Sequence, residues 1–513
     1  MIRQFAYATA IFISSACGLI IEIVAGRLIA PYVGMSLYTW TAIIAVVLTG
    51  LSLGHWIGGR LAGPDVGTVV GGRRVAIALG LAAISSMASL MLLRAVSAQL
   101  LGSGLPAIPS IILLTSALFL LPSLFVGIVS PILTKLAVDA DPLRHGPVIG
   151  RMYALGTLGS IAGTLCAGYV FISWIGSTGT VIAVAVVYAV LGLAFAISDS
   201  LRALFLALLV IAGASLGWWG QQVQAFISPC NTESNYFCIR VADYSDQTGR
   251  PSALMALDHL VHSINDRDDP SMLYSPYIHA VDELLKLRFA EKKEGFSPRA
   301  FFIGGGGYSL PRAWAHEFEA ADLIVAEIDP QVTRVAQENL WLNPATPGLT
   351  VNHRDARALL QSLPENEPFD LIFGDAFHDI SIPPHLVTQE FHSQIARRLA
   401  PGGAYAINVV DAGSSPLFLF SLIKTLNKDF SSVEAWVERE EIGNPGRVTF
   451  IVIASDTPSA VTTLTARHGV RRTWRRWPME DLEDRISRAG VPILSDDFAP
   501  VDRLMSRALL QAE

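Results

Sequence analysis

Long apolar runs dominate the first 222 residues of this 513-residue chain. They lie at residues 5–30, 38–57, 75–100, 108–137, 148–175, 181–197 and 203–219. A helix needs roughly 20 apolar residues to cross a bilayer, so each run is a candidate span. The first run is followed by too many others to be a cleaved signal peptide. We therefore predict a multi-pass α-helical membrane domain of about seven spans, in contact with lipid.

The charged residues divide the chain into two unlike parts. Residues 1–222 contain 10 Lys and Arg against 5 Asp and Glu, whereas the remainder contains 27 against 39. Since the second part is acidic, nucleic acid is an unsuitable partner for it. The sequence thus predicts a membrane part followed by a soluble, acidic part.

Basic residues occur mainly in every second connection between the apolar runs. If the N-terminus lies inside, the inner connections hold Arg3, Arg60, Arg73, Arg74, Lys135, Arg144, Arg151 and Arg202. The outer side holds little beyond Arg27 and Arg94. The positive-inside rule therefore predicts a cytoplasmic N-terminus, and seven spans then place the soluble part outside.

Small residues are dense between residues 154 and 163, where Gly156, Gly159 and Gly163 recur. Such spacing lets two helix backbones approach closely, so we expect this helix to pack tightly against a neighbour. Glu22, Arg27 and His55 lie within or at the ends of spans. Charges at that depth either serve a function or fix helix packing, and the sequence leaves both open.

The soluble part contains apolar runs that end in glycine or an acid. Residues 301–303 precede Gly304, Gly305, Gly306 and Gly307, and residues 323–326 precede Glu327. Asp355 and Asp375 follow the next two runs, and Asp375 follows residues 369–374 directly. In open parallel α/β sheets, ligands bind at these carboxyl ends of the strands.

This order of strand ends predicts a site for an adenosine-containing ligand. Glycines let the backbone approach the ligand closely, and an acid after the second strand can accept both ribose hydroxyls. The strict dinucleotide motif has a third glycine where this chain has Ser309, so a bare glycine turn is the alternative.

The soluble part divides further. Residues 223–285 begin with a linker and contain short alternating runs, at 236–241 and 252–257, that predict a small antiparallel sheet. Residues 286–513 then form the predicted α/β domain. Cys230 and Cys238 lie in the linker region and are the only plausible disulfide pair among 4 cysteines.

These motifs resemble the spermidine synthase (polyamine aminopropyltransferase) family in its membrane-fused bacterial form. The resemblance covers about residues 232–412. It implies a Rossmann-like fold of the spermidine synthase/methyltransferase type, with a small N-terminal β-sheet. It also implies that Glu327 holds the ribose, that Asp355 and Ala356 meet the adenine, and that Asp375 acts on an incoming amine. Tyr236, Asp258 and Tyr274 match the family's N-terminal sheet and its flap over the substrate.

Several positions depart from the family pattern. Gly307 replaces the loop acid that holds the aminopropyl amine, and His378 replaces the second acid for the acceptor. Phe237 and His262 replace two glutamines, and Asn408 stands in a strand end that usually contains glutamine. A diamine needs carboxylates at both ends, and most of them are missing. A ligand carboxylate, as in intact S-adenosylmethionine, meets less repulsion.

We therefore predict an enzyme that cleaves the chain carbon–sulfur bond of S-adenosylmethionine, or of its decarboxylated form, and releases methylthioadenosine. Asp375, His378 and Tyr274 are the candidate catalytic residues. Tyr308, His262 and His378 are expected to line the pocket for the substrate chain. Without an acceptor amine, the substrate's own carboxylate can attack that carbon, which makes the enzyme a lyase that forms homoserine lactone. No metal is expected.

The alternatives are an aminopropyltransferase with an amine acceptor, a methyltransferase acting on a lipid or membrane protein, and a non-catalytic transporter or sensor. The oligomeric state is open, and a homo-oligomer is compatible with the sequence. The resemblance implies the bacterial inner (plasma) membrane. The face of the soluble part stays open, because the charge count favours the outside whereas supply of an adenosyl substrate favours the cytoplasm. The Cys230/Cys238 pair is consistent with an oxidising side.

Overall fold

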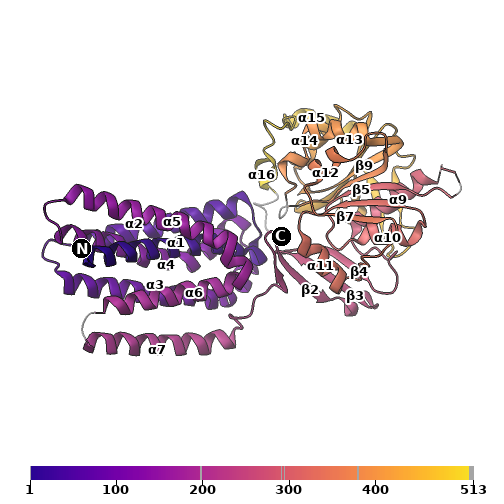
Figure 1. Ribbon diagram of the computed structural model, residues 1–513. Helices are drawn as coiled ribbons and strands as arrows, with labels where there is room; N and C mark the ends of the chain where they lie inside the picture. Colours follow the sequence, from indigo (N-terminus) through magenta and orange to yellow (C-terminus); the bar gives the residue numbers. More distant parts are fainter. Residues whose placement is uncertain (1, 197–198, 291, 294, 378–380, 508–513) are drawn as a thin grey trace. The chain divides into compact units, whose positions relative to one another are not determined.

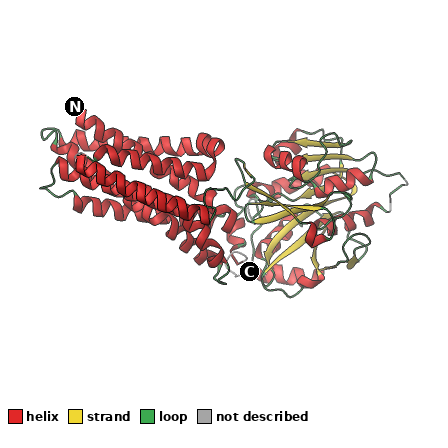
Figure 2. Cartoon of the chain, turned by 90° about the horizontal axis from the view of Figure 1, so that it is seen from below, coloured by secondary structure: helices red, strands yellow, loops and turns green. Residues whose placement is uncertain are grey.

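The computed structural model describes residues 2–196, 199–290, 292–293, 295–377 and 381–507. The chain forms two compact units, Met1–Cys238 and Ile239–Glu513. The first is almost entirely helical, and the second combines helices with strands (Figure 2).

The first unit consists of long apolar helices (Figure 1). They are α1 (Ile2–Val33), α2 (Leu37–Leu61), α3 (Thr68–Leu101), α4 (Ala107–Asp139), α5 (His145–Cys166), α6 (Ile172–Phe195) and α7 (Asp199–Gln222), with a π-helical turn, Ala167–Phe171, between α5 and α6. Six helical stretches, with His145–Phe195 taken as one, are long and apolar enough to cross a membrane. The helix α7 is the least buried of them and lies on the outside of the unit.

The stretch from α5 to α6 passes along the unit twice. Gly176, inside α6, has φ +70° and breaks the helix. Before the break, Arg151 donates a hydrogen bond to Gln4 near the start of α1 (3.3 Å). After the break, Gly192 lies against the backbone of Ala76 near the start of α3. Within the residues that the structure describes, the helical unit thus makes seven passes, which agrees with the number expected from the apolar runs.

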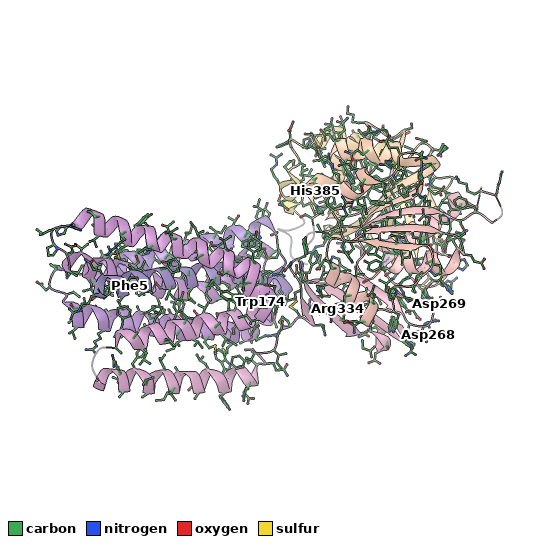
Figure 3. All side chains as sticks on the ribbon, in the orientation of Figure 1. Phe5, Trp174, Asp268, Asp269, Arg334 and His385 are labelled. Carbon is green, nitrogen blue, oxygen red and sulfur yellow. A yellow bond between two sulfur atoms is a disulfide. The ribbon has the colours of Figure 1, made fainter. Side chains whose placement is uncertain are left out.

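Glycines bring α5 against α1, as their spacing predicted. A Cβ atom added at Gly159 or at Gly163 would lie 2.2 Å from the carbonyl oxygen of Phe12 or Ala16, respectively. Atoms cannot approach so closely, so both positions must lack a side chain. Side chains at the two ends of the helical unit, such as Phe5 and Trp174, are labelled in Figure 3.

The segment after α7 folds back onto the end of the first unit. Cys230 and Cys238 form a disulfide, as the sequence suggested. Within the ring that this bond closes, the carbonyl oxygen of Tyr236 accepts a hydrogen bond from Arg27 at the end of α1 (2.6 Å). Glu233 accepts one from the first backbone N–H after the helix break (2.9 Å). The ring is therefore held by the Arg27 side chain of α1 and by a backbone N–H group of α6.

The second unit is built on a sheet of nine strands in the order β12-β13-β10-β11-β9-β8-β5-β6-β7. The strands are β5 (Arg299–Ile303), β6 (Asp322–Ala326), β7 (Leu349–Asn352), β8 (Phe369–Gly374), β9 (Leu399–Ala412), β10 (Ser432–Glu438), β11 (Arg447–Ser455), β12 (Thr463–Thr465) and β13 (Thr473–Arg476). From β9 to β7 the neighbours are parallel, and from β9 to β12 they are antiparallel.

Helices cover the two faces of this sheet (Figure 1). They are α9 (Pro276–Phe289), α10 (Ser309–Glu317), α11 (Pro330–Asn339), α12 (Ala356–Ser362), α13 (Gln389–Arg398), α14 (Leu417–Leu426) and α15 (Met479–Ala489), and a short α16 (Val501–Leu504) follows. Because both faces are covered, the central strands are apolar along nearly their whole length, as in Phe301, Phe302 and Ile303 of β5.

A second, small antiparallel sheet precedes the large one, as expected. It includes β2 (Cys238–Asp243), β3 (Ser252–Leu257) and β4 (Leu260–Asp266), with a single helical turn, α8 (Ser245–Thr248), between β2 and β3. The strand β4 contacts the glycine turn, residues 304–307, through Asn265.

Candidate active site

The glycine turn connects β5 to α10. Gly304 has φ +97°, and a Cβ atom there would lie 2.6 Å from the carbonyl oxygen of Asp375. Its N–H group donates to the carbonyl oxygen of Ala326, the last residue of β6 (2.9 Å). Only glycine fits this position, and through it the turn contacts the ends of both neighbouring strands.

Glu327 follows β6 and binds the glycine turn. One carboxylate oxygen accepts hydrogen bonds from the N–H groups of Gly305 (2.8 Å) and Gly306 (3.4 Å), and the other accepts one from Asp329 (2.9 Å). Burial raises the pKa of Glu327, and these N–H groups act in the opposite direction. An ionised carboxylate offers about four acceptor sites, so capacity for ligand hydroxyls remains.

Asp375 follows β8 and receives two side-chain hydrogen bonds. Tyr277, in the first turn of α9, donates its hydroxyl proton to one oxygen (3.1 Å), and Asn408 on β9 donates from its amide to the other (2.9 Å). Burial raises the pKa of Asp375 to about 7, although both donors lower it. The carboxyl group therefore changes charge near neutral pH.

Tyr277 takes the place that the sequence analysis gave to Tyr274. The hydroxyl of Tyr274 donates instead to Asp266 (2.9 Å), a buried carboxylate that also pairs with Arg250 (2.7 Å). The start of α9 decides between the two tyrosines, because Tyr274 precedes this helix and Tyr277 lies within its first turn. The pair Ser275-Pro276 marks that start and was the available signal.

Asp355 caps the N-terminus of α12. One oxygen accepts from the N–H of Ala358 (2.9 Å), and the other pairs with His385 (2.8 Å), which is labelled in Figure 3. Burial acts to raise the pKa of Asp355, but the N–H groups and His385 outweigh it and the pKa is lowered. Ala356 is buried at the first position of the helix. His385 was not among the predicted residues.

Tyr308, which we expected to line the substrate pocket, packs in the core beneath the glycine turn. Its backbone is left-handed (φ +57°) and its side chain is fully buried. The hydroxyl forms a hydrogen bond with Thr333 of α11 (2.6 Å). The left-handed backbone turns the ring beneath the glycine turn and into the core.

The remaining predicted site residues are Asp258, His262, Tyr236 and His378. Asp258 is buried with φ +53°, and its carbonyl oxygen accepts a hydrogen bond from Arg240 (2.7 Å). His262 on β4 is half-buried, and its carbonyl oxygen lies 3.3 Å from the hydroxyl of Tyr277. Tyr236 belongs to the first unit, and His378 lies outside the described residues.

Asn265, which the sequence analysis did not select, joins β4 to the glycine turn. Its amide donates to the carbonyl oxygen of Gly307 (2.7 Å) and its side-chain oxygen accepts from Ser309 (2.6 Å). A polar residue at the end of an alternating strand was the only signal. The small sheet is thereby fixed against the turn.

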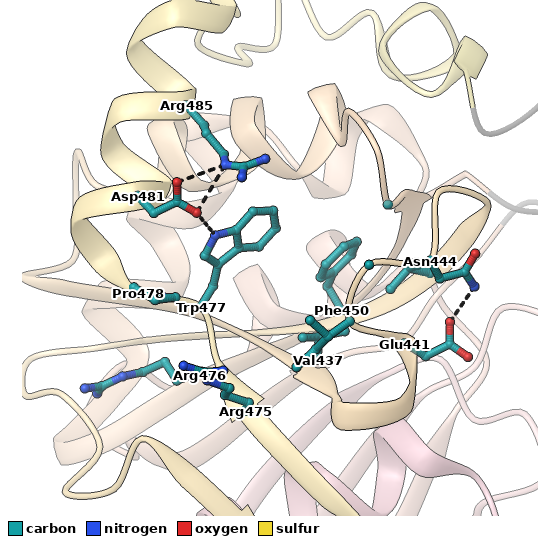
Figure 4. Close-up of a pocket in the computed structure, with 14 residues that line it drawn as sticks. Val437, Glu441, Asn444, Phe450, Arg475, Arg476, Trp477, Pro478, Asp481 and Arg485 are labelled. Atoms are coloured by element: carbon teal, nitrogen blue, oxygen red, sulfur yellow. Dashed lines mark hydrogen bonds and ion pairs between the residues drawn. The ribbon is translucent and has the colours of Figure 1, made fainter.

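A separate cavity of about 370 Å³ lies at the antiparallel side of the large sheet (Figure 4). Its lining includes Phe450 and Trp477, whose rings stack, and Asp481, which pairs with Arg485. The described residues that line it include none of the predicted site residues. Within the described residues, no group of three or more His, Cys, Asp or Glu could hold a metal ion.

Comparison with known proteins finds polyamine aminopropyltransferases, spermidine synthases and methyltransferases. No protein-family model matches the chain. A polyamine aminopropyltransferase from Vibrio vulnificus (strain CMCP6) is 31% identical over 137 residues, which are 26% of this chain and 44% of that protein. Polyamine aminopropyltransferase 2 from Streptomyces coelicolor (strain ATCC BAA-471 / A3(2) / M145) is 26% identical over 475 residues, 83% of this chain and 77% of that protein.

Among solved structures, a probable spermidine synthase from Corynebacterium glutamicum ATCC 13032 covers 54% of this chain and 99% of its own, with a TM-score of 0.45 and 20% identity. The match to the Vibrio protein spans less than half of that relative's length, whereas the Streptomyces match extends across both parts of this chain. The chain is thus similar to polyamine aminopropyltransferases over one or both of its parts, and these similarities support a spermidine synthase-like family.

Proposed function

We propose that the chain is an inner-membrane enzyme that cleaves the bond between the sulfur and the chain carbon of an adenosyl sulfonium and releases methylthioadenosine. The substrate is S-adenosylmethionine or its decarboxylated form. Glu327 would hold the ribose, Asp355 and Ala356 would lie towards the adenine, and Asp375 would face the reacting chain.

One observation carries this proposal: the glycine turn bridges the two carboxyl groups. Gly304 lies against the backbone of Asp375, and the next residue, Gly305, donates to Glu327. A ligand seated on the turn would therefore have one acid on each side. An adenosyl sulfonium has hydroxyls at one end and an ammonium at the other, which suits two acids so placed.

The chemistry follows from which nucleophile is aligned with the chain carbon. In the lyase reaction, a carboxylate oxygen of S-adenosylmethionine attacks that carbon while the carbon–sulfur bond breaks. The electron pair of the broken bond goes to sulfur, so neutral methylthioadenosine and homoserine lactone form without proton transfer. Asp375, as a carboxylate, would orient the substrate ammonium.

Aminopropyl transfer is the second candidate, and the names of the relatives favour it. An amine nitrogen would attack the same carbon of the decarboxylated sulfonium and lose a proton. Asp375 could accept that proton, because its pKa of about 7 is suited to general base catalysis.

Product analysis of the purified full chain separates these reactions. Methylthioadenosine from S-adenosylmethionine alone supports the lyase, whereas a requirement for the decarboxylated sulfonium and an amine supports transfer. We expect Asp375→Asn to lower turnover in both reactions, and by about 10²- to 10⁴-fold in aminopropyl transfer, where the variant loses a general base. S-adenosylhomocysteine as the product, or full activity of Asp375→Asn, would contradict the proposal.

A further inference from the structure

The side chain of Ser263 occupies the space beside Gly307. A Cβ atom added at Gly307 would lie 2.1 Å from the hydroxyl oxygen of Ser263 and 3.0 Å from a methyl group of Leu340. Ser263 is 1% exposed, and its hydroxyl has no hydrogen-bond partner among the described residues. A buried hydroxyl without a partner is unfavourable, so this group has capacity for a ligand atom.

A second polar atom without a partner lies beside Asp375. Asn408 uses its amide N–H to bind Asp375, but its side-chain oxygen is buried and accepts no hydrogen bond within the described part of the chain. That oxygen can only accept, so it suits an N–H donor such as an ammonium group.

Tyr277 lies between these two positions. Its hydroxyl is 3.1 Å from Asp375 and 3.3 Å from the carbonyl oxygen of His262, the residue before Ser263. Asn408 contacts Asp375, and its side-chain oxygen can accept a hydrogen bond, whereas the Ser263 hydroxyl can donate one.

We propose that Ser263 and Gly307 select the carboxylated sulfonium, S-adenosylmethionine, over its decarboxylated form. The Ser263 hydroxyl donates to the substrate carboxylate, while Asp375 and Asn408 accept hydrogen bonds from its ammonium group. Gly307 contributes by having no side chain, which leaves room for Ser263 and places no charge near the carboxylate. This inference rests on the function proposed above and names the substrate for the same site.

The test compares kcat/KM for the two sulfoniums, measured as methylthioadenosine release by the full chain. We expect Ser263→Ala to lower kcat/KM for S-adenosylmethionine about 10- to 100-fold, mainly through KM, because a hydrogen bond to a charged group is lost. The value for the decarboxylated sulfonium should stay unchanged. Val261→Ala, at an exposed position on the same strand, is the matched control and should alter neither value.

A double variant tests whether a carboxylate at position 307 shifts the preference to the decarboxylated sulfonium. Ser263→Gly removes the atoms nearest to position 307, so Gly307→Asp can then be accommodated. The new carboxylate would repel the substrate carboxylate, and preference should move towards the decarboxylated sulfonium. Equal losses for both sulfoniums in Ser263→Ala would overturn the inference, because they indicate a packing role.

Binding measurements separate this inference from the proposed function. If the wild type releases no methylthioadenosine from either sulfonium, the proposed reaction is wrong. Equilibrium dialysis of the two sulfoniums against wild type and Ser263→Ala still decides the inference. If Ser263→Ala loses affinity for S-adenosylmethionine alone, selection by Ser263 is supported. If wild type and Ser263→Ala bind S-adenosylmethionine equally well, the inference is contradicted.

Discussion

Asp375 combines burial with two hydrogen-bond donors, and its pKa of about 7 makes the site sensitive to pH. A buried carboxyl group is neutral below its pKa, and a neutral group neither attracts an ammonium nor accepts a proton from an amine. We therefore expect kcat/KM to rise with pH through about 7 and then to level off. Substrate binding should lower the apparent pKa in kcat, because the ligand is a cation. A flat profile between about pH 6 and pH 8 would contradict this role for Asp375.

The two tyrosines near α9 offer a matched comparison. Tyr277→Phe removes a donor that lowers the pKa of Asp375, so the acid limb of the pH profile should move to higher pH and activity at pH 7 should fall. Tyr274→Phe removes the same hydroxyl from a residue that binds Asp266 instead. We expect the pH profile of Tyr274→Phe to match that of the wild type. If Tyr274→Phe moves the profile as far as Tyr277→Phe does, the assignment of Tyr277 is wrong.

Among individual residues, the sequence identified those that come directly after a predicted strand. Gly304, Glu327 and Asp375 directly follow buried strands, so their neighbourhood was predictable. Tyr277 was not chosen over Tyr274, although Ser275-Pro276 marks the helix start that lies between them. Asn408 meets Asp375 across two neighbouring strands, and sequence spacing contains no information on that contact. The buried position of Tyr308 could not be predicted, because its left-handed backbone is a property of the folded turn.

The helix pair α1 and α5 packs through glycine, and this contact can be tested with a control on the same helix. At Gly163 a methyl group would collide with the backbone of Ala16, whereas at Gly150 no atom lies within 4 Å. Gly163→Ala should destabilise the helical unit by about 1–3 kcal/mol, the usual range for overpacking. Gly150→Ala should be neutral or slightly stabilising, because alanine favours a helix.

Thermal unfolding of both variants in detergent measures this difference. Equal midpoints for Gly163→Ala and Gly150→Ala would show that α5 does not depend on close backbone contact with α1. The assay needs no substrate, so it is independent of the proposed function.

Most helices and strands could be predicted from the sequence, because their segments are long or strongly apolar. The membrane helices and the central strands belong to this group. The short strands β12 and β13, Thr463–Thr465 and Thr473–Arg476, were missed because they are polar and only 3 and 4 residues long. The strand β13 pairs with β10, which lies far from it in the sequence, and β12 pairs with β13.

For the whole molecule, labelling can test on which side of the membrane the connections between the helices lie. Leu143 lies in the connection between α4 and α5, close to Lys135, Arg144 and Arg151, and Ser103 lies in the connection between α3 and α4. The positive-inside rule predicts that a membrane-impermeant maleimide labels Ser103→Cys in intact cells and Leu143→Cys only after lysis. The disulfide at Cys230 and Cys238 fits this orientation, because such bonds persist in oxidising compartments. The opposite labelling pattern would place the linker in the cytoplasm.

The break at Gly176 makes the number of passes odd. An odd count leaves the beginning of α1 and the end of α7 facing different compartments, whichever way the protein is inserted. A permanently charged sulfonium does not diffuse through hydrocarbon, so only one of the two aqueous pools can feed the chain beyond Gln222. Under the proposed function, sealed vesicles of known orientation should therefore release methylthioadenosine only when the substrate is supplied on the face at which α7 ends.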